Sequence, residues 1–273
     1  MNIRVACLSR HHSNDQLSIL GRSRQMRDTF RVIVNQFYTR FPALALRYRK
    51  LVKYGFEKET TPVKKYLSLS SRGLFVDIGA HLGSWSYALA SQRCSVIAIE
   101  PNPVLAGLLR RSRIVSTQVI EAALGDSEGS AVLQVPIIGG LPRPGNGTTT
   151  HFRMDADQDS LDLVVSQTTL DSLALDFVNA IKIDCEGGEL NVVKGGMGTL
   201  EEFRPLLVVE LHHDRQEELE EIFGLLRNLD YEVLWFSTAG SLEVGLVGIQ
   251  ERETENVIFC PRRDLEAVRG FRT

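Results

Sequence analysis

The segment FVDIGAHLGSWSYALA, residues 75–90, places an apolar strand-like run directly before a glycine-rich turn and a helical pattern. Gly79 and Gly83 permit a tight turn and a close approach of the backbone to its neighbours. Because the first amides of a helix have no acceptor within the helix, they can face a polar or anionic ligand at this turn. A buried strand joined to a helix in this way predicts a doubly wound sheet that binds its ligand at the first strand end.

Strand-like and helix-like segments alternate along the rest of the chain. Short apolar runs are predicted to form strands, and apolar residues at spacings of three and four are predicted to form helices. The predicted strands are 74–78, 95–100, 117–124, 180–184 and 205–211, and the predicted helices are 84–91, 103–112, 189–202 and 214–229. This alternation is typical of an α/β, Rossmann-like sheet with helices on both faces.

Two more strands are predicted in the last part of the chain, at 231–237 and 256–261, where they can pair antiparallel at one edge of the sheet. Residues 136–160 are rich in Gly, Pro and Thr, so we expect a surface loop there.

Residues 1–58 are predicted to form a basic, largely helical N-terminal extension ahead of a main domain at 59–273. Residues 1–65 contain 14 Lys and Arg against four Asp and Glu, whereas the rest of the chain contains 17 against 30. Apolar residues recur at helical spacing within 22–54. Such an arm can contact an anionic membrane surface, or it can pair with the acidic body of its own or a second subunit, as in a homodimer.

The four cysteines stand far apart and form no C-x-x-C pair, which indicates free thiols in a reducing compartment. The first 20 residues hold no apolar run of the length that an export signal needs, and no segment approaches about 18 consecutive apolar residues. We therefore expect a soluble, cytoplasmic protein.

Two acidic residues stand at predicted strand ends near the glycine turn. Glu100 lies 23 residues after Asp77, close to the spacing of roughly 20 at which an acidic residue binds ribose hydroxyls. The turn GAHLG lacks the G-x-G-x-x-G fingerprint that holds a dinucleotide pyrophosphate. S-adenosylmethionine, with a ribose and an amino-acid end, is therefore favoured over a nicotinamide dinucleotide; a tight junction without a ligand is the structural alternative.

A second group of charged residues follows the next two predicted strands. Its members are Lys182, Asp184, Glu186 and Glu189 in AIKIDCEGGE, and Glu210, His212 and His213 in LLVVELHH. Carboxylates this close together repel one another unless a cation or hydrogen-bond donors compensate. Lys182, a sulfonium cofactor or a metal ion could supply that compensation.

The segments FVDIGAHLGSWS, VIAIEPNP, AALGD, TTLDSL, IKIDCEGGELNVVKGG and RPLLVVELH, in this order, resemble the FkbM family of S-adenosylmethionine-dependent methyltransferases. The resemblance covers about residues 60 to 260. It implies a class I methyltransferase fold, with seven strands of which the last is antiparallel. It also implies methyl transfer to a hydroxyl oxygen of a sugar, glycolipid or secondary metabolite, and hence a small-molecule or glycan acceptor rather than nucleic acid.

The resemblance also implies roles for individual residues. Asp77, Gly79 and Gly83 match the first cofactor motif, and Glu100 matches the acid that binds ribose. Asp126 falls where the family approaches the adenine, although an Asp in a turn also serves purely local roles. A further member of the cofactor motif is His81, which we expect to shape the loop.

An alcohol acceptor must lose a proton, and a neutral histidine can take it at physiological pH, so His212 is the first candidate for the general base. Asp184 and Glu186 are the alternatives, as base or as groups that orient the acceptor. A divalent ion on Asp184, Glu186 and His212 is chemically reasonable, but a cationic cofactor already accounts for the carboxylates, and we expect no metal. A nicotinamide-dependent oxidoreductase and a catalytically silent binding module remain as alternative functions.

Overall fold

A computed structural model describes Arg40 and residues 57–138, 141–142, 149, 159–212, 215–239, 241–246 and 249–269. The predicted helical extension at 1–58 lies outside the described residues except for Arg40, Glu57 and Lys58, and so does most of the predicted loop at 136–160. Across the described part of the chain, none of the helices is both long enough and apolar enough to cross a membrane.

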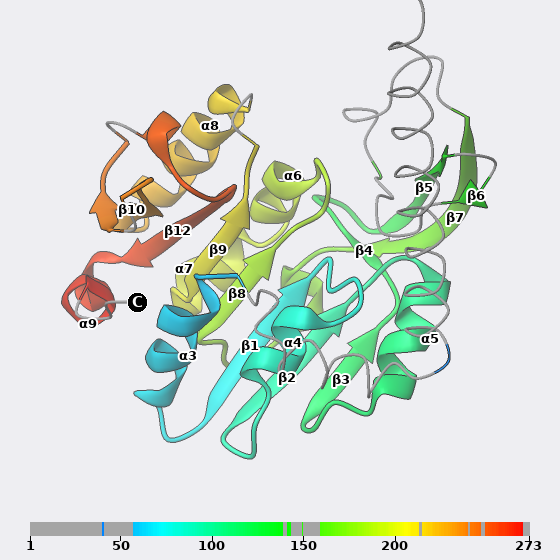
Figure 1. Ribbon diagram of the computed structural model, residues 1–273, viewed down its shortest axis with the longest axis horizontal. Helices are drawn as coiled ribbons and strands as arrows, with labels where there is room; N and C mark the ends of the chain where they lie inside the picture. The colour runs from blue at the N-terminus through cyan, green and yellow to red at the C-terminus, as the bar shows by residue number, and fades with distance from the viewer. Residues whose placement is uncertain are drawn as a thin grey trace, which may run out of the picture.

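The described residues form a central sheet of eight strands in the order β11-β10-β12-β9-β8-β1-β2-β3 (Figure 1). The strands are β1 (Gly73–Ile78), β2 (Cys94–Ile99), β3 (Thr117–Ile120), β8 (Ala180–Ile183), β9 (Leu206–Glu210), β10 (Tyr231–Phe236), β11 (Leu242–Val244) and β12 (Asn256–Pro261). The first five strands run parallel, and β12 is antiparallel to both β9 and β10. This confirms the predicted class I arrangement, to which the short edge strand β11 adds an eighth strand.

The inner strands are apolar because they are covered on both faces. Every residue of β1, β8 and β12 is buried, as expected for strands between two helical layers. Three buried polar residues interrupt these strands: Asp77 in β1, Lys182 in β8 and Asn256 in β12. Asp77 and Lys182 lie opposite each other in the strand register.

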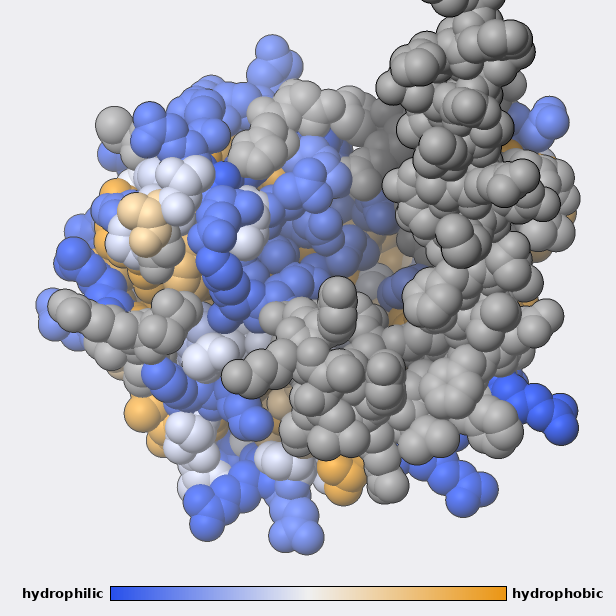
Figure 2. Space-filling model, viewed as in Figure 1, coloured by the Kyte–Doolittle hydropathy of each residue, from blue (hydrophilic) through white to orange (hydrophobic). Residues whose placement is uncertain are grey.

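Helices cover the two faces of the sheet. The helices are α3 (Thr60–Ser68), α4 (Ser84–Leu89), α5 (Pro103–Ser112), α6 (Glu189–Lys194), α7 (Met197–Phe203), α8 (Gln216–Arg227) and α9 (Leu265–Arg269). Apolar residues of α3, α4, α5 and α9 share one hydrophobic cluster, and those of α6, α7 and α8 share the other. Figure 2 shows hydrophilic residues over the outer sides of α6 and α8, as the amphipathic pattern predicts.

A second, four-stranded sheet differs from the prediction. It has the order β4-β7-β5-β6, with strands β4 (Ala123–Leu124), β5 (Gly129–Ile138), β6 (Leu141–Pro142) and β7 (Ser160–Thr168). In Figure 1 it lies on the opposite side of the view from β10 and α9. The predicted single strand 117–124 is therefore wrong, because its first part pairs with β2 and its last part with β7.

The predicted single helix over 189–202 is also interrupted, between α6 and α7, at Gly195 and Gly196. A Cβ on Gly195 would lie 2.0 Å from the carbonyl oxygen of Gly125. The backbone beside β4 thus touches the backbone between the two helices, which leaves no space for a side chain.

Candidate active site

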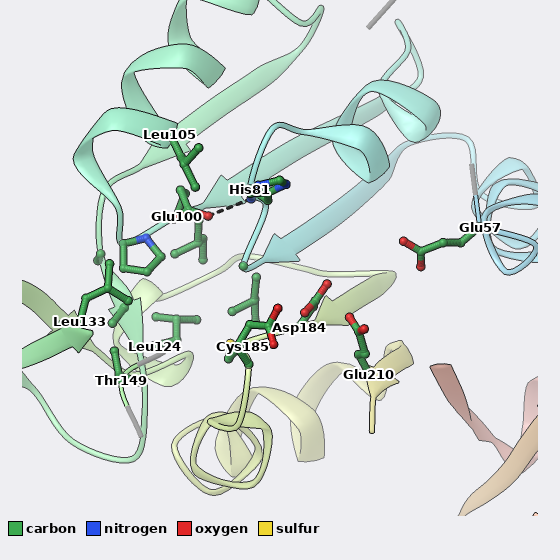
Figure 3. A pocket seen from close by; sticks show the side chains of 17 residues that line it. Glu57, His81, Glu100, Leu105, Leu124, Leu133, Thr149, Asp184, Cys185 and Glu210 are labelled. Atoms are coloured by element: carbon green, nitrogen blue, oxygen red, sulfur yellow. Dashed lines mark hydrogen bonds between the residues drawn. The ribbon is translucent and has the colours of Figure 1, made fainter. Parts of the chain in front are cut away.

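A cavity of about 220 Å³ lies where β1, β2, β8 and β9 end. Figure 3 shows its two ends. Leu105, Leu124 and Leu133 form an apolar end, whereas Asp184 and Glu210 lie toward Glu57 at an acidic end. His81 and Glu100 lie between the two ends, joined by a hydrogen bond. The cavity is therefore at the crevice that the strand–turn–helix segment predicts.

Close packing requires a glycine at the first position of this turn. Gly79 has a φ of +77°, and a Cβ on this residue would lie 1.7 Å from the carbonyl oxygen of Asp184. Gly83 has a φ of +81° and packs against Leu109 instead, 2.5 Å from where a Cβ would stand. Gly79 lines the cavity, whereas Gly83 acts on the hydrophobic side of the turn.

The amides of this turn are largely engaged within the protein, which differs from the expectation that they face a ligand. Gly79 and Ala80 both donate to the Ile99 carbonyl oxygen at 3.0 Å. The amide of His81 donates to Glu100 Oε2 at 2.8 Å. The turn thus binds the end of β2 and fixes the position of Glu100.

Glu100 is the carboxylate that the cavity holds most firmly. It is 5% exposed, and its second oxygen, Oε1, accepts a hydrogen bond from the Asn102 amide at 2.8 Å. Burial raises the pKa of Glu100 to about 7, although the two backbone amides lower it. A carboxylate has about four lone-pair positions, so two amide bonds leave acceptor capacity for a ligand.

The start of α5, next to Glu100, has a local explanation. Asn102 caps the helix by accepting a hydrogen bond from the Val104 amide, and Pro103 occupies the first helical position. This cap holds Pro101 and Leu105 against the cavity.

Asp77 lies behind the cavity rather than in its wall. Its Oδ2 accepts hydrogen bonds from the Ser86 amide at 2.9 Å and the Ser86 hydroxyl at 2.6 Å. Burial raises the pKa of Asp77 to about 6, with Ser86 and Lys182 acting against the rise. Asp77 therefore fixes the start of α4 relative to β1, and this contact stabilises the glycine turn between them.

Asp126, matched by resemblance to the adenine side, is exposed at the turn before β5. Its Oδ1 accepts a hydrogen bond from the neighbouring Ser127 hydroxyl. Residues from the adjacent backbone, Ala122 to Leu124, line the cavity instead. At that end of the cavity, a ligand would therefore contact apolar residues rather than the Asp126 carboxylate.

The acidic end is organised around the buried ammonium of Lys182. Its Nζ donates to Asp184 Oδ2 at 2.8 Å and to Glu210 Oε2 at 3.5 Å. Burial tends to lower the pKa of Lys182, but the charges of Asp184, Glu57 and Glu210 raise it well above its usual range. The lysine is therefore charged, and it supplies the compensation that the crowded carboxylates require.

Asp184 and Glu210 respond to this environment in opposite directions. Burial raises the pKa of Asp184, yet the Lys182 charge and a hydrogen bond from Glu210 outweigh it and lower that pKa. Burial, together with the hydrogen bond and charge of Asp184, raises the pKa of Glu210 to about 9. The Lys182 charge thus moves the pKa values of the two carboxyl groups apart.

Glu186 lines the cavity from a loop with unusual backbone geometry. Its φ is +51°, a left-handed conformation that is uncommon for glutamate. The loop is pinned by buried Glu189, whose Oε1 accepts hydrogen bonds from the Cys185 and Gly187 amides. Arg215 in turn donates to Glu189 Oε2 at 2.6 Å, so a buried ion pair maintains the loop.

His212 lies beside the acidic end and pairs with Glu255 through its Nδ1. It is not among the described residues that line the cavity, although one of its nitrogens lies within 4.8 Å of carboxylate oxygens of both Glu210 and Glu255. His212 and Glu255 thus form a His–Glu pair beside the cavity. His213 lies outside the described residues.

Two parts of the cavity were not found from the sequence. Glu57, near the end of the predicted N-terminal extension, reaches the acidic end and accepts a hydrogen bond from Asn256 at 2.7 Å. Leu133, from the second sheet, reaches the apolar end. Neither residue belongs to a local motif, so only long-range contacts reveal them.

Comparison with known proteins supports one family. The model of the methyltransferase FkbM domain matches residues 77–233, which is more than half of the chain. None of the curated proteins matches.

Several solved structures are similar at low identity. An FkbM methyltransferase from Methylobacillus flagellatus is 16% identical with a TM-score of 0.44, over 69% of this chain; this chain spans only 43% of that protein's length. A TehB-like SAM-dependent methyltransferase from Corynebacterium glutamicum is 12% identical with a TM-score of 0.42, over 80% of this chain and 96% of that one. The assignment therefore depends on the domain match: the chain belongs to the FkbM methyltransferase family.

Proposed function

We propose that the chain transfers a methyl group from S-adenosylmethionine to a hydroxyl oxygen of a small-molecule or glycan acceptor. The observation that carries this proposal is the buried Glu100 carboxylate, held by two backbone amides in the middle of a cavity with one apolar and one acidic end. The family match supplies the reaction class.

The residues of the cavity fit this cofactor. Glu100 can accept hydrogen bonds from ribose hydroxyls, because its two amide bonds leave acceptor positions. Leu105, Leu124 and Leu133 line the apolar end, which suits the faces of an adenine ring. Gly79 provides a position without a side chain at the cavity wall. When bound, the cofactor supplies an activated methyl group on a sulfonium centre.

The acidic end is where we place the acceptor. Asp184 lies at this end and Glu186 also lines the cavity, whereas His212 pairs with Glu255 beside it. Ionised carboxylates accept hydrogen bonds from an alcohol and can orient it for in-line transfer. Of the three candidate bases, the geometry therefore supports the carboxylates over His212.

Calorimetric titration tests the cofactor assignment. The protein should bind S-adenosylhomocysteine, the demethylated product, and should show no heat with NAD at the same concentration. Saturable binding of NAD without binding of the sulfur nucleoside would establish the oxidoreductase alternative instead.

A second measurement tests turnover. Incubation with methyl-labelled S-adenosylmethionine and fractionated extract of the source organism should label an acceptor whose methyl group is on oxygen, as mass spectrometry would show. Cofactor binding without labelled product in any fraction would instead support a catalytically silent module.

A further inference from the structure

Lys182 lies in a buried strand in the middle of the sheet. Burial of an ammonium group there has a large unfavourable desolvation free energy unless the charge is paired. Its side chain is 1% exposed, and its Nζ lies 5.5 Å from the centroid of the Trp85 ring. Asp77 is its neighbour in β1, and Val208 is its neighbour in β9. The ammonium is thus held under the floor of the cavity, where solvent does not replace its protein partners.

Those partners are two carboxyl groups of the cavity wall on adjacent strands. Asp184 lies two residues after Lys182, so both side chains are expected on the same face. The ammonium contacts Asp184 at 2.8 Å and Glu210 at 3.5 Å. One cation therefore fixes the positions of both carboxyl groups at the acidic end.

One ammonium lies within 3.5 Å of an oxygen of both carboxyl groups. Two ionised carboxylates at one site repel each other, and this repulsion favours a proton on one of them. A pair that shares one proton has a single negative charge, which the ammonium balances.

We propose that Lys182 is a positioning residue, and that it keeps Asp184 ionised and aligned, with Glu210 as the proton-bearing partner, to accept a hydrogen bond and then the proton of the acceptor hydroxyl. This inference rests on the proposed methyl transfer to oxygen. Lys182 itself does not touch the acceptor. Its role is exerted through Asp184, the group that does.

The proposed step balances. The oxygen–hydrogen bond of the acceptor breaks, and the proton moves to an oxygen of Asp184. The electron pair of that bond stays on the acceptor oxygen, which uses a lone pair to bond the methyl carbon, while the pair of the breaking carbon–sulfur bond remains on sulfur. Asp184 then returns the proton to solvent and the charge balance with Lys182 is restored.

Other charged groups face this cluster and must be considered in any pH experiment. Asp77 approaches from β1, and Glu57 and Glu59 approach from the segment that leads into α3. On the Asp184 side, His81 and Glu100 contribute from the glycine turn and the end of β2. Among these groups, Lys182 makes an ion pair with Asp184 at 2.8 Å.

Carbon-13 NMR of aspartate carboxyl groups tests the inference on the protein alone. The Asp184 resonance is assigned by its loss in Asp184→Asn. In the wild type it should titrate below the ordinary aspartate range. In Lys182→Met its midpoint should rise by about 1–3 pH units, the usual effect of an adjacent cation on an aspartate.

Two controls separate charge from structure. Lys182→Arg retains the cation, so Asp184 should keep a low midpoint even if the protein melts earlier. Glu210→Gln retains a hydrogen-bond donor to Asp184, so its midpoint should stay near that of the wild type. A wild-type midpoint at or above the ordinary range, or an unchanged midpoint in Lys182→Met, would overturn the proposal. The wild-type measurement decides the matter if Lys182→Met does not fold.

The same variants connect the charge to turnover. As the pH is lowered, methyl transfer to the labelled acceptor fraction should begin to fall at a higher pH in Lys182→Met than in the wild type. The affinity for S-adenosylhomocysteine should change less than threefold. If activity fell at the same acidic pH in both proteins, the result would contradict the positioning role of Lys182. Absence of nucleoside binding in the wild type would instead refute the proposed function and leave the NMR result standing.

Discussion

The two ends of the cavity are built in different ways. The middle of the cavity comes from one continuous stretch, Gly79 to Leu105, in which backbone amides of a turn and a helix start hold Glu100, and Leu124 and Leu133 complete the apolar end. At the acidic end, one buried ammonium joins Asp184 and Glu210, and Glu57 lines the same end from a distant part of the chain. Local backbone geometry therefore fixes the cofactor side, whereas long-range charge balance fixes the acceptor side.

This difference explains why the pKa values of Glu100 and Asp184, two carboxyl groups of one cavity, shift in opposite directions. Neutral amides hold Glu100, and they do not overcome the effect of burial, so its pKa rises to about 7. A full positive charge holds Asp184, and its pKa falls. Environments that separate the pKa values of neighbouring carboxyl groups also separate their chemical roles.

The largest expected effect comes from removing the space at Gly79. Gly79→Ala would place a methyl group 1.7 Å from the Asp184 carbonyl oxygen at a φ of +77°, so we expect a loss of more than about 4 kcal/mol in the free energy of unfolding. Urea denaturation measures it. Gly224→Ala in α8, where nothing lies within 4 Å, should instead gain up to about 1 kcal/mol. Similar stabilities for both variants would show that the close approach of Gly79 to the Asp184 backbone does not constrain the fold.

Glu100→Gln tests the cofactor side specifically. The glutamine loses the charge and cannot accept both amide hydrogen bonds, so S-adenosylhomocysteine affinity should fall by about 10- to 100-fold, which corresponds to one or two lost hydrogen bonds to a charged group. Calorimetry provides the dissociation constants. Glu121→Gln, an exposed partner of Arg110, is the matched control and should bind normally. Equal affinities for the two variants would remove Glu100 from the site.

The pH dependence of binding sharpens the same comparison. The pKa of Glu100 is raised to about 7 in the ligand-free protein, and ribose hydroxyls donate to the ionised form. Binding therefore expels a proton below pH 7, and affinity should increase about tenfold between pH 6 and pH 8. The increase should vanish in Glu100→Gln. An unaltered slope in that variant would assign the titration to another group.

The smallest effect is expected at His212. His212→Asn keeps a hydrogen-bonding partner for Glu255 and leaves the cavity wall intact, so cofactor affinity should change less than twofold and methyl transfer less than about tenfold. Asp184→Asn should lower transfer by at least about 100-fold, within the range that a positioned base contributes. The reverse order of the two variants would identify His212 as the base and would weaken the case for a charge-controlled acceptor side.

The central sheet and the cofactor turn could be predicted from the sequence because their signals are local. Apolar runs of strand length, the glycines at 79 and 83, and the acid that ends the second strand are all visible within 26 residues, 75–100. The same locality explains the two wrong element predictions. Whether 117–124 and 189–202 continue depends on β7 and on the contact between Gly195 and Gly125, which no local pattern contains.

Tertiary structure decided which polar residues face the cavity. Asp77 and Glu100 both follow apolar runs. Asp77 accepts a hydrogen bond from Ser86 behind the cavity, whereas Glu100 lines the cavity. Likewise, Lys182 can be seen as a possible counter-charge, but its ion pairs with both Asp184 and Glu210 depend on strand register. Sequence determines periodicity and backbone freedom, which act over a few residues; ionisation depends on burial and on charges brought together from distant segments, and only the folded chain sets these.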